Sequence, residues 1–381
     1  MFHYTTKCMY SKIHQYSFFM FLSIVQLGCN STTKLSQEKN SLKNAFKDDF
    51  LIGAAIGKDY ILEKDSVANQ LIKAQFNSIT PENIMKSEVI HPEKGRYDFT
   101  KSDKYVEYGQ KNKMYIVGHT LVWHSQLSKF AEKIDNSDSL YQFMADHINT
   151  VAGRYAGKIN SWDVVNEALN EDGTMRQSIF QKLLGDDYIQ KAFELAAKAD
   201  PKAELYYNDY NIEQSAKRKG AIALIKKLKA KGVKIDGVGI QGHWSLDKAP
   251  LDEIEQSIIE FAALGVKVAF TEFDITVIPN PWDLKGAEIS QNYEGSPKMN
   301  PYPTALPDSV QTQLAKRYED IFKIFLKHKD KISRVTFWGV NDGHSWLNGW
   351  PIKKRTNYPL LFDRKYQPKP AYEAVMKLKI Q

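Results

Sequence analysis

Two glutamates stand at the ends of apolar runs in this chain. Glu167 ends the run SWDVVNEA at residues 161–168, and Glu272 lies in FTEFDI at residues 270–275. Either glutamate alone could emerge into solvent or pair with an arginine. As a pair they suit hydrolysis of a glycosidic bond, in which one carboxyl group protonates the leaving oxygen and the other attacks or activates water. The adjacent Asn166 would then hydrogen-bond the 2-hydroxyl of a sugar, a contact that strengthens in the transition state.

A catalytic metal is the main chemical alternative for these residues. Carboxylate and imidazole groups that could bind a metal are present, but no two of them show close ligand spacing such as His-x-x-x-His. We therefore expect neither a metal nor another cofactor. The side chains considered as ligands are Glu82, His119, His124, His243 and Glu272.

The elements that position these side chains are eight apolar runs of strand length. Amphipathic segments of helical periodicity separate them, and this alternation predicts a single TIM (β/α)8 barrel. An open, doubly wound sheet is the alternative, but the first run is a poor match to its glycine-rich phosphate turn. The runs are FLIGAAIG (50–57), FNSITPEN (76–83), MYIVGHTLVW (114–123), INSWDVVNEA (159–168), ELYYNDYN (204–211), GVGIQGHW (237–244), VKVAFTEFDI (266–275) and RVTFWGVND (334–342).

Nearly every run ends in polar or aromatic residues, and this favours the barrel over the open sheet. The C-terminal ends of barrel strands converge on one face, where active sites lie. The stretch FWGVNDGHSWLNGW at 337–350 follows the last strand and contributes Trp338, Trp346 and Trp350. These tryptophans could be core side chains. The glycines and asparagines around them instead predict a loop at the barrel mouth, where flat aromatic rings stack on sugars.

Composition indicates a soluble enzyme, because 43% of the 381 residues are hydrophobic and 25% are charged. The net charge of +7 is spread along the chain. Basic runs such as KRKG at 217–220 and KKLKAK at 226–231 have helical spacing and predict a solvated helix face, so we expect no nucleic-acid partner.

The first 28 residues have the pattern of an export signal. Lys7 and Lys12 precede the apolar run SFFMFLSIVQLG at 17–28, which is too short to span a bilayer. Gly28 before Cys29 resembles a lipoprotein cleavage site, although Gln26 departs from it. We expect an exported protein, lipid-anchored at Cys29 in a bacterial cell envelope, with simple secretion as the alternative.

Beyond the signal, we expect a flexible tether at residues 29–45 and the catalytic barrel at 46–381. The tether sequence is polar and lacks periodicity. Cys8 would leave with the signal, so the mature chain could form no internal disulfide. Aromatic residues in an open binding groove favour a monomer.

The motifs together resemble glycoside hydrolase family 10, the retaining endo-β-1,4-xylanases, over residues 46–376. They occur in the family's order and several are long and specific. They are TPENIMK, GHTLVWHSQ, SWDVVNEA, YYNDYN, GIQGHW, FTEFDI, WGVNDGHSW and PLLFDRKYQPKPAYEAV.

The resemblance implies a role for each matching residue. Glu167 would be the acid/base, Glu272 the nucleophile, and His243 and Asp274 the groups that orient the nucleophile. Xylan or xylo-oligosaccharides would be the substrate. The sugar before the cleaved bond would contact Lys86, His119, Trp123, Asn166, Gln241 and Trp338. The next sugar would contact Glu82, Asn83, Gln126 and Trp346, and Asn208 and Tyr210 would face the leaving side.

The chain departs from the family pattern at Ile84, where an acidic residue is frequent, and at Ser87, where tryptophan often follows the lysine. Both departures bear on chain-length preference. The segment 277–312 is long and is expected to shape the leaving-side subsites. Two other functions stay open: an endo-β-1,4-glucanase, if a hydroxymethyl group fits the cleft, and a xylan-binding lipoprotein without activity.

Overall fold

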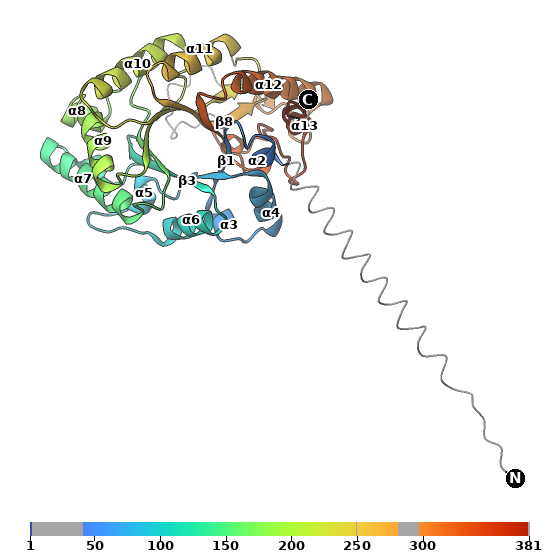
Figure 1. The fold of residues 1–381 in the computed structure, drawn as a ribbon, viewed down its shortest axis with the longest axis horizontal. Coiled ribbons are helices and arrows are strands. Elements are labelled where there is room, and N and C mark those ends of the chain that lie inside the picture. The colour runs from blue at the N-terminus through green and yellow to red at the C-terminus, as the bar shows by residue number, and fades with distance from the viewer. Residues whose placement is uncertain (2–40, 249, 281–296, 380–381) are drawn as a thin grey trace.

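Eight parallel strands close into a barrel in the computed structural model, which describes residues 1, 41–248, 250–280 and 297–379 (Figure 1). Each strand pairs with its sequence neighbour in the barrel, and the pairing of β1 with β9 completes the circle. The barrel strands are β1 (Leu51–Ile56), β2 (Ser78–Pro81), β3 (Tyr115–Trp123), β4 (Ser161–Asn166), β5 (Glu204–Asp209), β6 (Gly237–Ile240), β8 (Lys267–Thr276) and β9 (Ile332–Phe337).

The predicted TIM barrel is confirmed, and every predicted run overlaps a strand. The run at 237–244 is divided, because Gly242 adopts a positive φ of 77° after β6. The short strand β7 (His243–Ser245) follows this turn and pairs with β8. The turn leaves Gln241 and His243 at the barrel mouth beside the end of β8.

Helices surround the barrel on its outer side (Figure 1). Several begin at capping residues: the side chain of Asp65 accepts hydrogen bonds from Val67 and Ala68, and Asn136 accepts one from Ser139. The helices of eight or more residues are α4 (Ser66–Gln75), α6 (Thr100–Lys111), α7 (Ser137–Arg154), α9 (Tyr188–Ala199), α10 (Ser215–Ala230), α11 (Leu251–Ala262), α12 (Asp308–Lys327) and α13 (Pro370–Lys377). Shorter ones are α2 (Leu42–Ala45), α3 (Lys58–Ile61), α5 (Ser87–Ile90) and α8 (Ile179–Leu184).

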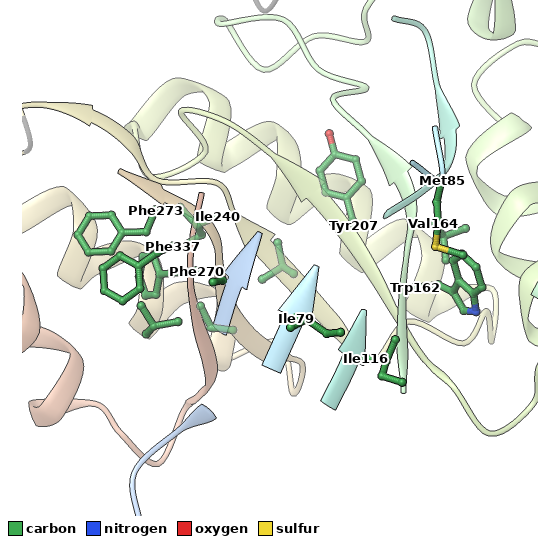
Figure 2. Close-up of a cluster of buried hydrophobic side chains, with 14 of the residues drawn as sticks. Ile79, Met85, Ile116, Trp162, Val164, Tyr207, Ile240, Phe270, Phe273 and Phe337 are labelled. Atoms are coloured by element: carbon green, nitrogen blue, oxygen red, sulfur yellow. The ribbon is translucent and has the colours of Figure 1, made fainter. Parts of the chain in front are cut away.

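Apolar side chains fill the space between the strands and the helices. Figure 2 shows Phe270, Phe273 and Phe337 packed together on β8 and β9. Phe322 of α12 also packs against this group, with its ring centroid 6.3 Å from that of Phe337. Inside the barrel the fit is tight, since a Cβ on Gly237 would lie 2.1 Å from the ring of Tyr206.

The folded chain begins before the predicted boundary. Residues 41–45 were expected to belong to the flexible tether, but they enter helix α2 and Leu42 is fully buried. Phe46 packs on Phe50 and Phe322, which explains why the preceding turn is folded. The tether prediction is wrong for residues 41–45. The rest of the tether, the signal sequence and Cys29 lie outside the described residues.

Two further expectations are corrected. Lys217 and Arg218 of the basic run on α10 were expected to be solvated, but both are buried. Each forms ion pairs, which offset the cost of burying its charge. The loop expected to reach residue 312 ends earlier, since α12 begins at Asp308. In the described part of the chain, no helix has the length and apolar character needed to cross a bilayer.

A buried histidine pair lies in the layer of helices. The Nδ1 atoms of His91 and His147 are 3.3 Å apart, and both rings stack with Phe143. Burial lowers the pKa of His91 to about 4, and burial together with the neighbouring His91 lowers the pKa of His147 to about 3. Both rings are therefore neutral at pH 7.

We expect this pair to make the fold sensitive to acid. Unfolding returns each histidine to a pKa of about 6.5, so the unfolded chain binds more protons than the folded one below that pH. Stability is then present above pH 6.5 and is lost as the pH falls toward 4. The variant His147→Phe keeps an aromatic ring. Its free energy of unfolding, from denaturant titrations, should fall less steeply between pH 6 and 4, by up to about 1.4 kcal/mol per pH unit.

Candidate active site

A cleft of about 720 Å³ opens at the C-terminal ends of the barrel strands. It brings together most of the residues predicted from the sequence. They are Lys86, His119, Trp123, Asn166, Glu167, Tyr210, Gln241, His243, Glu272, Asp274, Trp338 and Trp346. Four predicted residues do not line it: Glu82, Asn83, Gln126 and Asn208.

Glu167 is buried at the end of β4 and its carboxylate accepts two hydrogen bonds. The indole Nε1 of Trp123 donates to Oε2 at 2.8 Å, and Nε2 of Gln241 donates to Oε1 at 2.9 Å. Burial raises the pKa of Glu167, and the negative charges of Asp209 and Glu272 raise it further against these two hydrogen bonds. Glu167 is thus the carboxyl group that keeps its proton more readily.

Glu272 lies on β8 with a different set of neighbours. Nδ2 of Asn208 donates to its Oε1 at 2.7 Å, and Nε2 of His243 lies 3.2 Å from its Oε2. Burial alone would raise the pKa of Glu272. The hydrogen bond from His243 and the charges of nearby histidines and Lys86 outweigh burial, so the pKa lies below its usual value. Glu272 is the carboxyl group that ionises first.

His243 connects Glu272 to Asp274. Its Nδ1 lies 2.9 Å from Oδ1 of Asp274, whose Oδ2 accepts a hydrogen bond from the Trp346 indole at 2.8 Å. Burial would lower the pKa of His243, but the two carboxylates raise it to about 10. Since the imidazolium carries a proton on both nitrogens, His243 donates to both carboxylates at neutral pH.

Three amide side chains join the two glutamates. Nδ2 of Asn208 donates to Asn166 Oδ1 at 2.9 Å as well as to Glu272, while its own oxygen accepts from Thr271. Nε2 of Gln241 also lies 3.4 Å from Asn166 Oδ1. Because ionised Glu272 can only accept, it fixes the orientation of Asn208 and then of Asn166. The Nδ2 group of Asn166 is left to donate into the cleft.

Asn208 is therefore not a contact for the leaving sugar. It was expected to face the leaving side, but it is fully buried and holds Glu272 and Asn166 from within the barrel. The expectation is wrong because Asn208 lies within β5 and points to the barrel interior. There its Oδ1 occupies the space that a Cβ on Gly239 would need, 2.3 Å away. Tyr210, two residues on, does line the cleft.

Lys86 connects the cleft to the residues beside it. Its Nζ donates to Asn83 at 2.9 Å and to Gln126 at 2.8 Å, and it lies 4.9 Å from the ring centroid of Trp123. Gln126 in turn donates to Glu88 at 2.8 Å. Gln126 thus supports Lys86 from behind, while exposed Asn83 stays accessible at the edge of the cleft.

His119 is held in one orientation by a carboxylate. Its Nδ1 lies 2.9 Å from Oδ2 of Asp163, and its ring packs edge-on against Trp338.

Within residues 41–248, 250–280 and 297–379, no three His, Cys, Asp or Glu side chains are grouped so that they could hold a metal ion.

Comparison with known protein families identifies the family of this chain. The family described as glycosyl hydrolase family 10 matches residues 41–378. The chain belongs to glycosyl hydrolase family 10.

The similar proteins align with nearly the whole length of this chain. Endo-1,4-beta-xylanase A of Xylanibacter ruminicola is 45% identical over 349 residues, covering 90% of this chain and 95% of that protein. Beta-1,4-xylanase of Dictyoglomus thermophilum is 41% identical over 360 residues, covering 94% and 96%. A solved GH10 endoxylanase from a sugarcane soil metagenome superimposes with a TM-score of 0.85 at 48% identity, covering 89% of this chain and 100% of that one.

Arg176 lines the cleft, but sequence reasoning missed it. Its Nε donates to the main-chain oxygen of Glu167 at 3.0 Å, and its Nη2 donates to Leu169 O at 3.1 Å and to the Tyr210 hydroxyl at 2.7 Å. Glu167 has a positive φ of 57°, which a non-glycine residue adopts only when its surroundings hold it there. The one signal in the sequence was an isolated arginine in the polar loop NEDGTMRQS.

We expect Arg176→Lys to impair catalysis although the charge is kept. One ammonium group cannot replace the planar fork that holds three acceptors. A shift of Glu167 by about 1 Å is enough to reduce kcat by up to about 10²-fold. Initial rates on xylan measure the loss. Arg96→Lys is the matched control, because Arg96 is exposed and paired only with Glu93; equal kcat in both variants would contradict the role of Arg176.

Proposed function

We infer that this protein is an endo-1,4-β-xylanase that cleaves xylan with retention of configuration. The observation that carries this conclusion is the pair of buried carboxyl groups in one family 10 cleft, one with a raised pKa and one with a lowered pKa. Retaining glycosidases need this combination of a protonated acid and an ionised nucleophile. The xylanases among its relatives support xylan or xylo-oligosaccharides as the substrate.

We propose that Glu272 is the nucleophile and Glu167 the acid/base. A carboxylate oxygen of Glu272 forms a bond to the anomeric carbon, while the bond from that carbon to the leaving oxygen breaks and Glu167 gives this oxygen its proton. Ionised Glu167 next takes a proton from water, whose oxygen attacks the anomeric carbon and releases Glu272. Two inversions at the same carbon return the original configuration.

The proposed sugar contacts follow from which polar groups remain available. Asn166 has its amide nitrogen left for the 2-hydroxyl, and His119, Lys86 and Trp338 line the same part of the cleft. For the next sugar we propose Glu82, Asn83 and Trp346, with Gln126 acting through Lys86. Tyr210 is proposed as a contact on the leaving side.

Replacing Glu167 by alanine tests the acid/base role. We expect hydrolysis of xylan to fall by about 10²–10⁴-fold. The first step on a dinitrophenyl xylobioside should stay fast, because that leaving group needs no proton. Azide should restore turnover and give a β-xylobiosyl azide, since it attacks the glycosyl-enzyme from the side that Glu167 vacated. Product NMR identifies the anomer.

Glu272→Ala tests the nucleophile role and should give the azide of the opposite anomer. Azide should then attack the substrate directly and give an α-azide. Glu107→Ala, on the exposed face of α6, is the control and should keep full activity. A β-azide from Glu272→Ala, or undiminished xylan hydrolysis in either cleft variant, would contradict the assignment. Carboxymethylcellulose assayed in parallel tests the glucanase alternative, which equal release from both polymers would favour.

We also propose that the protein is an exported monomer with a lipid anchor on Cys29. The support is the leader pattern, with two lysines, the apolar run 17–28 and the Gly28–Cys29 pair. In a bacterial host, wild-type protein should sediment with membranes, and Cys29→Ser should appear in the soluble fraction. Immunoblots of the two fractions measure this. Identical distribution of both proteins would contradict the anchor.

A further inference from the structure

Asp209 is a fully buried carboxyl group at the end of β5 that the proposed mechanism does not use. Its Oδ1 accepts a hydrogen bond from the main-chain nitrogen of Tyr210 at 2.9 Å and lies 3.0 Å from Nζ of Lys217. Its Oδ2 accepts from the Tyr207 hydroxyl at 2.5 Å and from the main-chain nitrogen of Leu169 at 3.4 Å. Four donors therefore surround this one carboxyl group.

Those contacts favour the ionised form of Asp209: burial raises its pKa, but the charge of Lys217 and the hydrogen bond from Tyr207 act in the opposite direction. A protonated carboxyl group would need an acceptor for its own hydrogen, but each contact above supplies a hydrogen. The Tyr207 hydroxyl accepts a hydrogen bond from the main-chain nitrogen of Ala168 at 3.2 Å, and Asp209 is the acceptor for its own single hydrogen. Lys217 is also fully buried, and its Nζ lies 3.4 Å from the ring centroid of Tyr210. A buried negative charge thus sits beside the turn that follows Glu167.

The same contacts hold the main chain around Glu167. Ala168 and Leu169 follow Glu167 directly, and they bond to Tyr207 and Asp209 respectively. Arg176 holds the carbonyl groups of Glu167 and Leu169 from the other side. The strained turn at Glu167 is therefore fixed through its amide nitrogens by one group of residues and through its carbonyl oxygens by another.

We propose that Asp209 is a positioning residue for the acid step, holding the turn at Glu167 and keeping the Glu167 carboxyl group protonated by its negative charge. The proposal rests on the assignment of Glu167 as acid/base. The charge of Asp209 is the second cause, after burial, that raises the pKa of Glu167.

Other ionisable groups also face the carboxyl groups of Glu167 and Asp209. Glu167 faces Glu272 from β8, Lys86 before α5, Tyr210 after β5 and Arg176 in the loop after β4. Asp209 faces Lys217 of α10, Tyr207 of β5, Tyr188 of α9 and Arg176. None of these groups is changed in Asp209→Asn, which removes the negative charge and also one of the two acceptor oxygens that face the four donors.

The test is the pH dependence of kcat/KM for phenyl xylobioside, measured on the full-length enzyme. Asp209→Asn removes the negative charge at constant shape. Glu167 should then lose its proton at a lower pH, so the basic limb of the profile moves to lower pH by roughly half a unit or more. The acid limb, set by Glu272, should move less.

A double variant guards against a folding failure. Asp209→Asn leaves the buried Lys217 with only the longer contact to Glu171, 3.4 Å away. Asp209→Asn with Lys217→Met removes both charges, which buried sites tolerate better. Its basic limb should move in the same direction. The control is Asp342→Asn with Lys369→Met, which removes another buried ion pair, 2.9 Å apart, that contacts no residue of the Glu167 turn. The control should lose stability with its basic limb unmoved.

These measurements distinguish a failure of the Asp209 proposal from a failure of the assignment of Glu167 as the acid. A basic limb that stays in place in both Asp209 variants, or that moves equally in the control, overturns the role of Asp209. A basic limb that persists in Glu167→Ala means instead that Glu167 is not the acid, and the proposed function fails first. Loss of the limb in Glu167→Ala with a shift in both Asp209 variants supports the proposal.

Discussion

Two buried carboxyl groups that share one cleft repel each other when both are ionised, and the rest of the site is arranged around this repulsion. Glu167 and Glu272 are equally deep, so burial raises the pKa of each. What separates them is the charge of their neighbours. Lys86 faces both glutamates, but Glu272 also faces the His243 imidazolium, whereas Glu167 faces the negative charge of Asp209 and accepts from neutral donors on Trp123 and Gln241.

The barrel makes this separation possible because each strand delivers its side chains to the same mouth. The end of β4 carries Asn166 and Glu167, and β8 carries Glu272 and Asp274. Between them, β5 supplies Asn208 to one glutamate and, one residue later, Asp209 to the turn of the other. Adjacent positions of a single strand, whose side chains point to opposite faces, thus serve the two carboxyl groups in opposite ways.

Residues that contact the two glutamates or their partners hold this arrangement. Arg176 fixes the strained main chain at Glu167, and Asp274 orients His243 and Trp346 together. Thr271 orients Asn208, which sets the amide of Asn166. These side chains in the cleft therefore have partners that restrict their freedom to rotate, which lowers the entropy lost when a ligand is positioned.

The sequence by itself predicted the alternation of strands and helices, the barrel, and the place of the two glutamates at the mouth of the barrel. Hydrophobic runs and their polar ends are local patterns, and the long motifs around Glu167, His243 and Glu272 are specific. It failed where contacts join segments far apart in the chain. Lys217 was read as solvated, Asn208 as a leaving-side contact, and Arg176 drew no notice. Only the tertiary structure decided these roles, because burial and hydrogen-bond partners arise when separate strands and loops meet.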